Sequence, residues 1–205
     1  MLTLWGRANS INVQKVVWCL EELALPYERI EAGLAYGINH TPAYLAMNPN
    51  GLVPVLKDGD LVMWESNATV RYLAAAYDAG GLWPEDARQR ALADRWCDWQ
   101  LSVFNPAFGP AFHGLVRSPG SRPTAEIAAS HARTEAAMRI LDEHLADRAF
   151  LAGDRLSFGD VVLGSSVHRW LHMPVERQPT PHARRWYDAL AARPATEKAF
   201  LLPLD

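Results

Sequence analysis

The sequence predicts an α/β domain followed by an all-helical domain. In the first eighty residues, short apolar runs of strand length alternate with stretches whose apolar residues recur every three or four positions. Beyond the linker-like segment Leu82–Asp86 no convincing strand pattern appears. A chain of 205 residues fits one large domain or two modest ones, and it can bury a sizeable core without metals or disulfides. We therefore place an α/β domain at residues 1–80 and a helical domain at residues 87–205.

The N-terminal domain begins with a predicted strand, helix and strand. Leu2–Trp5 is a short apolar run ended by a glycine, as expected of a buried strand. Ile11–Ala24 has the apolar spacing of an amphipathic helix, which Pro26 then prevents from continuing. Tyr27–Glu31 follows as a second strand.

The rest of this domain predicts a loop, a short helix, a hairpin and a helix. Residues 32–41 have no periodicity, and Thr41-Pro42 is typical of a helix start, giving a helix to about Met47. Two apolar runs, 53–56 and 61–63, flank Asp58-Gly59, which is a strong hairpin signal. Ser66–Tyr77 returns to helical spacing.

The C-terminal half contains only helical patterns. The first, Arg88–Phe104, is followed by Asn105-Pro106 and Gly109-Pro110, which imply a kink or a break. Three further helices are expected at 124–146, 157–171 and 182–193.

Composition excludes several classes of function. With 23 acidic and 20 basic residues the chain has no basic footprint, which argues against a nucleic-acid partner. Its two cysteines, Cys19 and Cys97, form no C-x-x-C motif, which argues against a zinc site, a disulfide framework or a dithiol centre. Both are expected to be inert core thiols. No signal peptide or membrane-spanning run is seen, so we expect a cytoplasmic protein with no metal and no membrane partner.

Two local motifs have structural interpretations of their own. Leu156–Val161 fits a capping box, in which Ser157 and Asp160 would exchange bonds at a helix start. Val53-Pro54 places a residue without an N–H at an edge or at a strand start. An X-Pro bond is cis in only about 5–6 % of cases, so the sequence alone favours trans here.

Three segments together carry a resemblance to a known family. They are Ser157-Phe158-Gly159-Asp160, Asn-Pro-Asn-Gly-Leu-Val-Pro-Val-Leu at 48–56, and Glu-Ser-Asn-Ala at 65–68. In this combination they resemble the cytosolic glutathione transferases over nearly the whole chain, closest to the bacterial and theta- or nu-like branches. The resemblance implies a thioredoxin-like first domain, which binds glutathione, and a helical-bundle second domain, which contributes the electrophile pocket.

The resemblance implies how glutathione would be held. A cis Val53-Pro54 bond would turn the N–H and C=O of Val53 outward, where they can pair with the cysteinyl backbone of glutathione. Ser66, at a helix start, would hold the γ-glutamyl carboxylate because first-turn amides are unpaired, and Glu65 would face the ammonium. Ser66 could instead cap its own helix.

The candidates for thiol activation lie between the first strand and the first helix. Ser10 would donate its hydroxyl to the glutathione sulfur, and a helix N-terminus lowers the pKa of a thiol. Asn12 matches the hydroxyl-x-Asn pattern of the nu-like enzymes and could supply a second donor. Two alternatives stay open: Ser10 only caps the helix, or Asn9 is the donor. The cysteine of the beta-like branch is absent here, which weakens a thiol-exchange function.

Recognition of the glycine end departs from the family pattern. Between Gly33 and Leu56 the chain has no lysine or arginine to hold the glycine carboxylate. The polar candidates are Asn39, His40 and Asn50, of which only His40 can be charged. His40 could equally be a surface residue.

The electrophile pocket is expected beside the interrupted helix. Most aromatic residues of 96–112 should belong to the core, but Phe108, Phe112 and His113 are candidates for contacting the second substrate. The resemblance therefore implies a homodimeric enzyme that conjugates glutathione, as co-substrate, to a small apolar electrophile, with a detoxifying or a catabolic role left open. Two alternatives remain: a glutathione-dependent peroxidase or disulfide reductase, and a non-catalytic ligand-binding or interaction protein.

Overall fold

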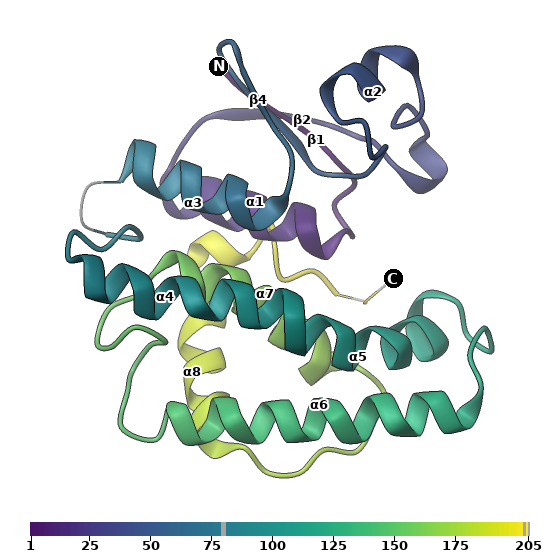
Figure 1. Ribbon diagram of the computed structural model, residues 1–205, viewed down its shortest axis with the longest axis vertical. Helices are drawn as coiled ribbons and strands as arrows, with labels where there is room; N and C mark the ends of the chain where they lie inside the picture. The colour runs from purple at the N-terminus through teal and green to yellow at the C-terminus, as the bar shows by residue number, and fades with distance from the viewer. Residues whose placement is uncertain (79–80, 203, 205) are drawn as a thin grey trace.

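The computed structural model describes residues 1–78, 81–202 and 204, so Gly80 of the predicted domain boundary lies outside the described residues. A four-stranded mixed sheet is built from the elements predicted before residue 80 (Figure 1). They are β1 Leu2–Trp5, α1 Ile11–Glu22, β2 Tyr27–Ile30, the 3₁₀ turn η1 Leu34–Tyr36, α2 Pro42–Met47, β3 Val55–Asp58, β4 Leu61–Met63 and α3 Ser66–Tyr77.

The sheet has the strand order β2-β1-β3-β4. The strands β1 and β2 run parallel because the helix α1 carries the chain back between them. The predicted hairpin pairs β3 with β4 in antiparallel register, with Asp58 opposite Leu61, and β3 also pairs antiparallel with β1. The helices α1 and α3 cover the sheet face that turns toward the helical half, and α2 lies outside it (Figure 1).

The rest of the chain is helical, as the sequence predicts. Its elements are α4 Ala87–Trp99, η2 Gln100–Phe104, α5 Asn105–Phe112, η3 His113–Arg117, α6 Thr124–His144, α7 Phe158–His172, α8 Pro181–Ala191 and the 3₁₀ turn η4 Pro194–Thr196. The proline-rich segment does not break the helical path: η2 and η3 are π turns that continue it on both sides of α5. Proline lacks the N–H for an ordinary helical bond, and π turns commonly occur where that pattern is interrupted.

The helix α7 joins the two halves of the molecule. A Cβ on Gly164 would lie 2.9 Å from the Trp18 ring, and a Cβ on Gly159 would lie 2.6 Å from the carbonyl oxygen of Ala93. Glycine at these two positions therefore lets α7 pack directly against α1 and α4. The main apolar core is therefore continuous between the two halves, and it holds α1 against α7.

The predicted capping box is present at the start of α7. The carboxylate of Asp160 accepts hydrogen bonds from the N–H and hydroxyl of Ser157, at 2.9 and 2.7 Å. It also accepts from the N–H of Leu151 at 2.9 Å and from Trp186 Nε1 at 2.8 Å. Asp160 therefore links α7 to α8 and to the loop before α7.

Three findings concern the cysteines, the metal-ligating side chains and the length and polarity of the helices. Cys19 and Cys97 are buried and free, and burial raises the pKa of the Cys97 thiol to about 12. No group of three or more potential metal-ligating side chains occurs in the described part of the chain. Within the same residues, no helix combines the length and the apolar character needed to cross a membrane.

Candidate active site

The loop between β1 and α1 positions the first group of candidate residues. Ser10 is the N-cap of α1 and is 5 % exposed, but its side chain makes no capping hydrogen bond. Its carbonyl accepts from the Gln14 N–H at 2.8 Å, so the backbone alone begins the helix. Asn12 lies in the first helical turn. The hydroxyl of Ser10 is thus left for another acceptor.

A cleft of about 270 Å³ brings this loop together with the proline-rich helix. Its lining includes Ser10 and Asn12 as well as Phe108, Phe112 and His113, which the sequence proposed separately for two different tasks. Asn9, the alternative donor, does not line this cleft; it lines a neighbouring hollow with Tyr36 and the C-terminal leucines. Ser10 and Asn12, but not Asn9, therefore line the same cleft as the aromatic candidates.

Three arginines also line this cleft, and two of them, Arg117 and Arg169, lie far from Ser10 in the sequence, where no local pattern indicates them. Both guanidinium groups lie over the Phe112 ring, 5.4 and 4.8 Å from its centroid. Both donate to the carbonyl oxygen of Asn9, at 3.2 and 2.5 Å. Burial and the charges of Arg117, Arg122 and Arg169 lower the pKa of His113, which favours the neutral ring. Cationic side chains therefore surround an aromatic wall.

Arg7 is the third arginine of the cleft. A Cβ on Gly33 would lie 3.1 Å from Arg7 Nη1 and 3.3 Å from the Val53 side chain, so Arg7 extends from the cleft toward the loop before β3. Its buried Nε has no hydrogen-bond partner among the described residues. Burial and the charge of Arg117 lower the pKa of Arg7.

The Val53-Pro54 bond is cis, as the family resemblance implied and against the preference for trans from the sequence alone. The preceding Leu52 carbonyl accepts from the Tyr44 hydroxyl and from Asn48 Nδ2, both at 2.8 Å, which holds the approach to the turn. Within the described chain, neither the N–H nor the C=O of Val53 has a hydrogen-bond partner. This residue offers one donor and one acceptor for an extended peptide.

Glu65 and Ser66 form the start of α3. Glu65 is the N-cap and has φ of 70°, a left-handed conformation that costs a residue with a side chain about 1–3 kcal/mol. Ser66 is the first helical residue and is 5 % exposed, and its hydroxyl has no partner among the described residues. Ser66 therefore does not cap α3, contrary to the alternative left open from the sequence. Its hydroxyl lies beside unpaired first-turn amides, as an anion-binding site requires.

His40 lies apart from the cleft. It is exposed, and its ring contacts the Asn39 amide at 3.1 Å and lies close to Gly51. Asn39 Nδ2 also donates to the Gly51 carbonyl at 2.7 Å, so the Asn39 amide has a structural partner. Of the two, His40 has more freedom to meet a carboxylate from solvent.

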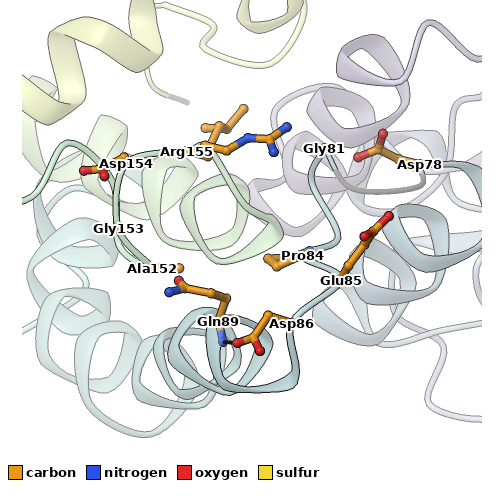
Figure 2. A pocket seen from close by; sticks show the side chains of 11 residues that line it. Asp78, Gly81, Pro84, Glu85, Asp86, Gln89, Ala152, Gly153, Asp154 and Arg155 are labelled. Atoms are coloured by element: carbon orange, nitrogen blue, oxygen red, sulfur yellow. Dashed lines mark hydrogen bonds between the residues drawn. The ribbon is translucent and has the colours of Figure 1, made fainter.

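A larger hollow lies at the linker between the two halves, and it shares no lining residue with the cleft. It has a volume of about 800 Å³. Figure 2 shows the acidic side chains of its wall, which are Asp78, Glu85, Asp86 and Asp154, together with one arginine, Arg155. The glutathione that the family resemblance implies carries two carboxylates, which a wall of this composition repels. The smaller cleft beside Ser10 is the better candidate for the active site.

Comparison with known proteins identifies the family. Residues 1–75 match the family described as "Glutathione S-transferase, N-terminal domain", and residues 124–189 match "Glutathione S-transferase, C-terminal domain". Glutathione S-transferase GstB of Escherichia coli is 44 % identical over 208 residues, covering all of both chains. The disulfide-bond oxidoreductase YfcG of the same organism is 27 % identical, covering 95 % of this chain and 92 % of its own.

A solved structure of similar sequence shares the whole architecture. The theta class glutathione S-transferase of Xanthomonas axonopodis pv. citri, solved with glutathione bound, is 47 % identical and superposes with a TM-score of 0.95. The match covers 100 % of this chain and 99 % of that one. The fold and the sequence matches thus define a glutathione-dependent enzyme with a thioredoxin-like first domain and a helical second domain. The chain belongs to the glutathione S-transferase family.

Proposed function

We propose that this glutathione S-transferase binds glutathione along Val53 and directs its thiolate at an electrophilic carbon in the cleft beside Ser10. The sulfur forms a bond to that carbon, and the leaving group departs with its electron pair. The observation that carries the proposal is the single cleft that Ser10 and Asn12 share with Phe108 and Phe112. The protein contributes orientation of the two substrates and a lowered thiol pKa.

Ser10 and Asn12 are proposed as the donors to the sulfur. The Ser10 hydroxyl has no partner within the described chain, so it can donate to a thiolate without breaking an internal bond. Hydrogen bonds to an anion stabilise it more than they stabilise the neutral thiol, which lowers the thiol pKa. The position of both residues at the start of α1 adds the favourable end of the helix dipole.

The two ends of glutathione are proposed to bind on either side of Val53. Ser66 and the first amides of α3 would hold the γ-glutamyl carboxylate, with Glu65 facing the ammonium. The cis bond at Pro54 supports pairing of Val53 with the cysteinyl backbone. His40 is proposed to meet the glycine carboxylate from the exposed loop before α2.

The electrophile is proposed to be small and to carry an apolar ring or chain. A cleft of about 270 Å³ leaves room for a compact molecule, and Phe108 and Phe112 provide apolar contact. Arg117 and Arg169 also line the cleft, and their positive charge favours an electrophile that bears an electron-rich or anionic substituent.

We further propose the roles of the two domains and the homodimer that are expected from the sequence. Residues 1–80 would bind glutathione, and residues 87–205 would contribute the electrophile pocket. The protein would act in the cytoplasm. A homodimer is supported by large apolar side chains left exposed in both halves, such as Trp64 at 39 % and Leu101 at 45 %. Light scattering after size exclusion should give twice the 22.8 kDa of the chain.

Turnover assays distinguish conjugation from its rivals. The identity of 44 % to GstB, against 27 % to YfcG, supports conjugation over disulfide reduction. Activity with a chloroaryl electrophile should therefore exceed activity with a hydroperoxide or a small disulfide. The reverse order would assign the chain to glutathione-dependent reduction. Failure of glutathione to bind at millimolar concentration would support a non-catalytic role instead.

A further inference from the structure

Lys15 is a buried cation between the two domains. It lies on the second turn of α1, its side chain is 0 % exposed, and its ammonium donates to three side-chain amides. The acceptors are Asn67 Oδ1 at 2.9 Å, Asn12 Oδ1 at 3.2 Å and Gln100 Oε1 at 3.2 Å. A lysine is rarely buried completely, and here three neutral oxygens match the three N–H donors of its ammonium.

This arrangement determines how the three amides are turned. An ammonium group only donates, so each amide must present its oxygen to Lys15 and its nitrogen elsewhere. Asn67 Nδ2 donates to the Cys97 carbonyl at 3.1 Å, and Gln100 Nε2 donates to the Ser166 hydroxyl at 2.8 Å. Asn12 Nδ2 has no acceptor among the described residues, and Asn12 lines the cleft. Its N–H donors are therefore the ones left for a bound molecule.

Through Asn12 and Asn67, the Lys15 ammonium connects the two helix starts that hold the proposed glutathione contacts. Asn67 directly follows Ser66 on α3, and Asn12 follows Ser10 by two residues on α1. Burial lowers the pKa of Lys15 to about 7, against the opposing influence of Cys97 and Glu65 and with a further lowering by Arg169. The hydrogen-bonded chain continues from Gln100 through Ser166 to Asn105, which lines the cleft from α5.

We propose that Lys15 is a positioning residue for glutathione conjugation, which holds the oxygen of Asn12 so that the amide N–H groups point at the thiolate. Lys15 itself contacts neither substrate. Its positive charge, which is present at a pH below its lowered pKa of about 7, polarises the Asn12 amide, which makes the N–H groups stronger donors to the sulfur. The inference rests on the proposed role of Asn12 as a donor.

The test is the titration of the bound thiol in the full-length protein. The ultraviolet absorption of the thiolate, followed against pH in the complex with glutathione, gives the thiol pKa directly. Lys15→Met should raise that pKa by about one unit, which lowers kcat/KM about tenfold at a pH below both pKa values. The KM for glutathione should change little, because Val53 and Ser66 are untouched. Lys15→Arg, which keeps a cation, should raise the thiol pKa less than Lys15→Met does.

A double-mutant cycle separates positioning from a structural role. If Lys15 acts through Asn12, Lys15→Met together with Asn12→Ala should raise the thiol pKa no more than Asn12→Ala alone. Additive shifts would overturn the inference, because Lys15 would then act on the sulfur independently. A stability control is Val16→Ala, which removes buried atoms next to Lys15 and should leave the thiol pKa unchanged.

Two further outcomes distinguish this inference from the proposed function. If Asn12→Ala raises the thiol pKa and Lys15→Met does not, the role of Lys15 is overturned and the role of Asn12 stands. If the thiol pKa is unchanged in Asn12→Ala, the role of Asn12 and this inference are both overturned. Ser10 then remains as the donor. Lys15→Gln, which keeps an N–H donor but no charge, replaces Lys15→Met if that variant does not fold. It should give a smaller shift, again absent in the Asn12→Ala background.

Discussion

Two serines at helix N-caps should respond in opposite ways to replacement by alanine. Ser10 precedes α1 and makes no side-chain capping bond, whereas Ser157 precedes α7 and forms the capping box with Asp160. Ser10→Ala removes no hydrogen bond within the described chain, so the free energy of unfolding should change by less than about 0.5 kcal/mol. Ser157→Ala removes a buried hydroxyl that donates to Asp160 at 2.7 Å and should cost about 1–2 kcal/mol.

The thiol pKa should show the reverse pattern. A hydrogen bond to a charged group contributes about 1.5–3 kcal/mol, and one pKa unit corresponds to about 1.4 kcal/mol. Ser10→Ala should therefore raise the pKa of bound glutathione by about 1 to 2 units and lower kcat/KM about 10- to 100-fold at a pH below it. Ser157→Ala should leave that pKa unchanged, because its hydroxyl is fully buried against Asp160.

The assay compares the two variants by thiolate absorption against pH and by thermal unfolding. For a chain of this size, 1 kcal/mol corresponds to about 2–4 °C in Tm, so Ser157→Ala should lower Tm by about 2–8 °C. The reasoning is refuted if Ser10→Ala loses stability on that scale while the thiol pKa stays in place. Ser10 would then be a structural cap, and thiol activation would fall to Asn12 or Asn9.

Three further predictions concern buried groups. Asp160→Ala leaves four donors without their acceptor and should cost about 3–5 kcal/mol in chemical denaturation; a loss below 1 kcal/mol would contradict the network at the start of α7. Burial lowers the pKa of His168 from 6.5 to about 4, so the unfolded chain holds the proton more tightly. Titration of His168 should therefore lower the free energy of unfolding by about 3 kcal/mol between pH 6.5 and pH 4. The prediction is refuted if the wild type and His168→Gln lose the same stability over that range. Cys97→Ala should keep full activity, and the buried Cys97 thiol should resist alkylation in the native protein, since rapid modification would require local opening.

Most of the fold could be predicted from short-range patterns. The helix α3 spans Ser66–Tyr77, as predicted, because its apolar spacing and its polar start lie in adjacent residues. The helical path through Pro106 and Pro110 could not be predicted. Whether a proline breaks a helix depends on whether a wider turn can be packed, and that is decided by the neighbouring helices.

The candidate site could be predicted only in part, because its members meet through long-range contacts. Ser10 and Asn12 were visible from their place between a strand and a helix. Arg169 donates to the carbonyl of Asn9 across 160 positions of sequence, and no local spacing indicates that contact. The isomer of the Val53-Pro54 bond depends on tertiary packing, since the intrinsic preference for trans is only about 0.5–1 kcal/mol.

Lys15 shows a different limit of sequence interpretation. It interrupts the apolar run from Val13 to Leu20, and such a residue normally marks the polar face of a helix. In the folded chain that face is buried against α3 and η2, whose amides accept from the ammonium. The five apolar residues after Lys15, Val16–Leu20, cover every face of the helix, and this run is the signal that could have drawn attention to it.

A structure of the protein crystallised with glutathione tests the account most directly. We predict the tripeptide extended beside the cis Pro54, paired with the N–H and C=O of Val53, and its sulfur within hydrogen-bond distance of Ser10 and Asn12. Electron density for glutathione elsewhere, or none beside Val53 at millimolar concentration, would contradict the proposed chemistry.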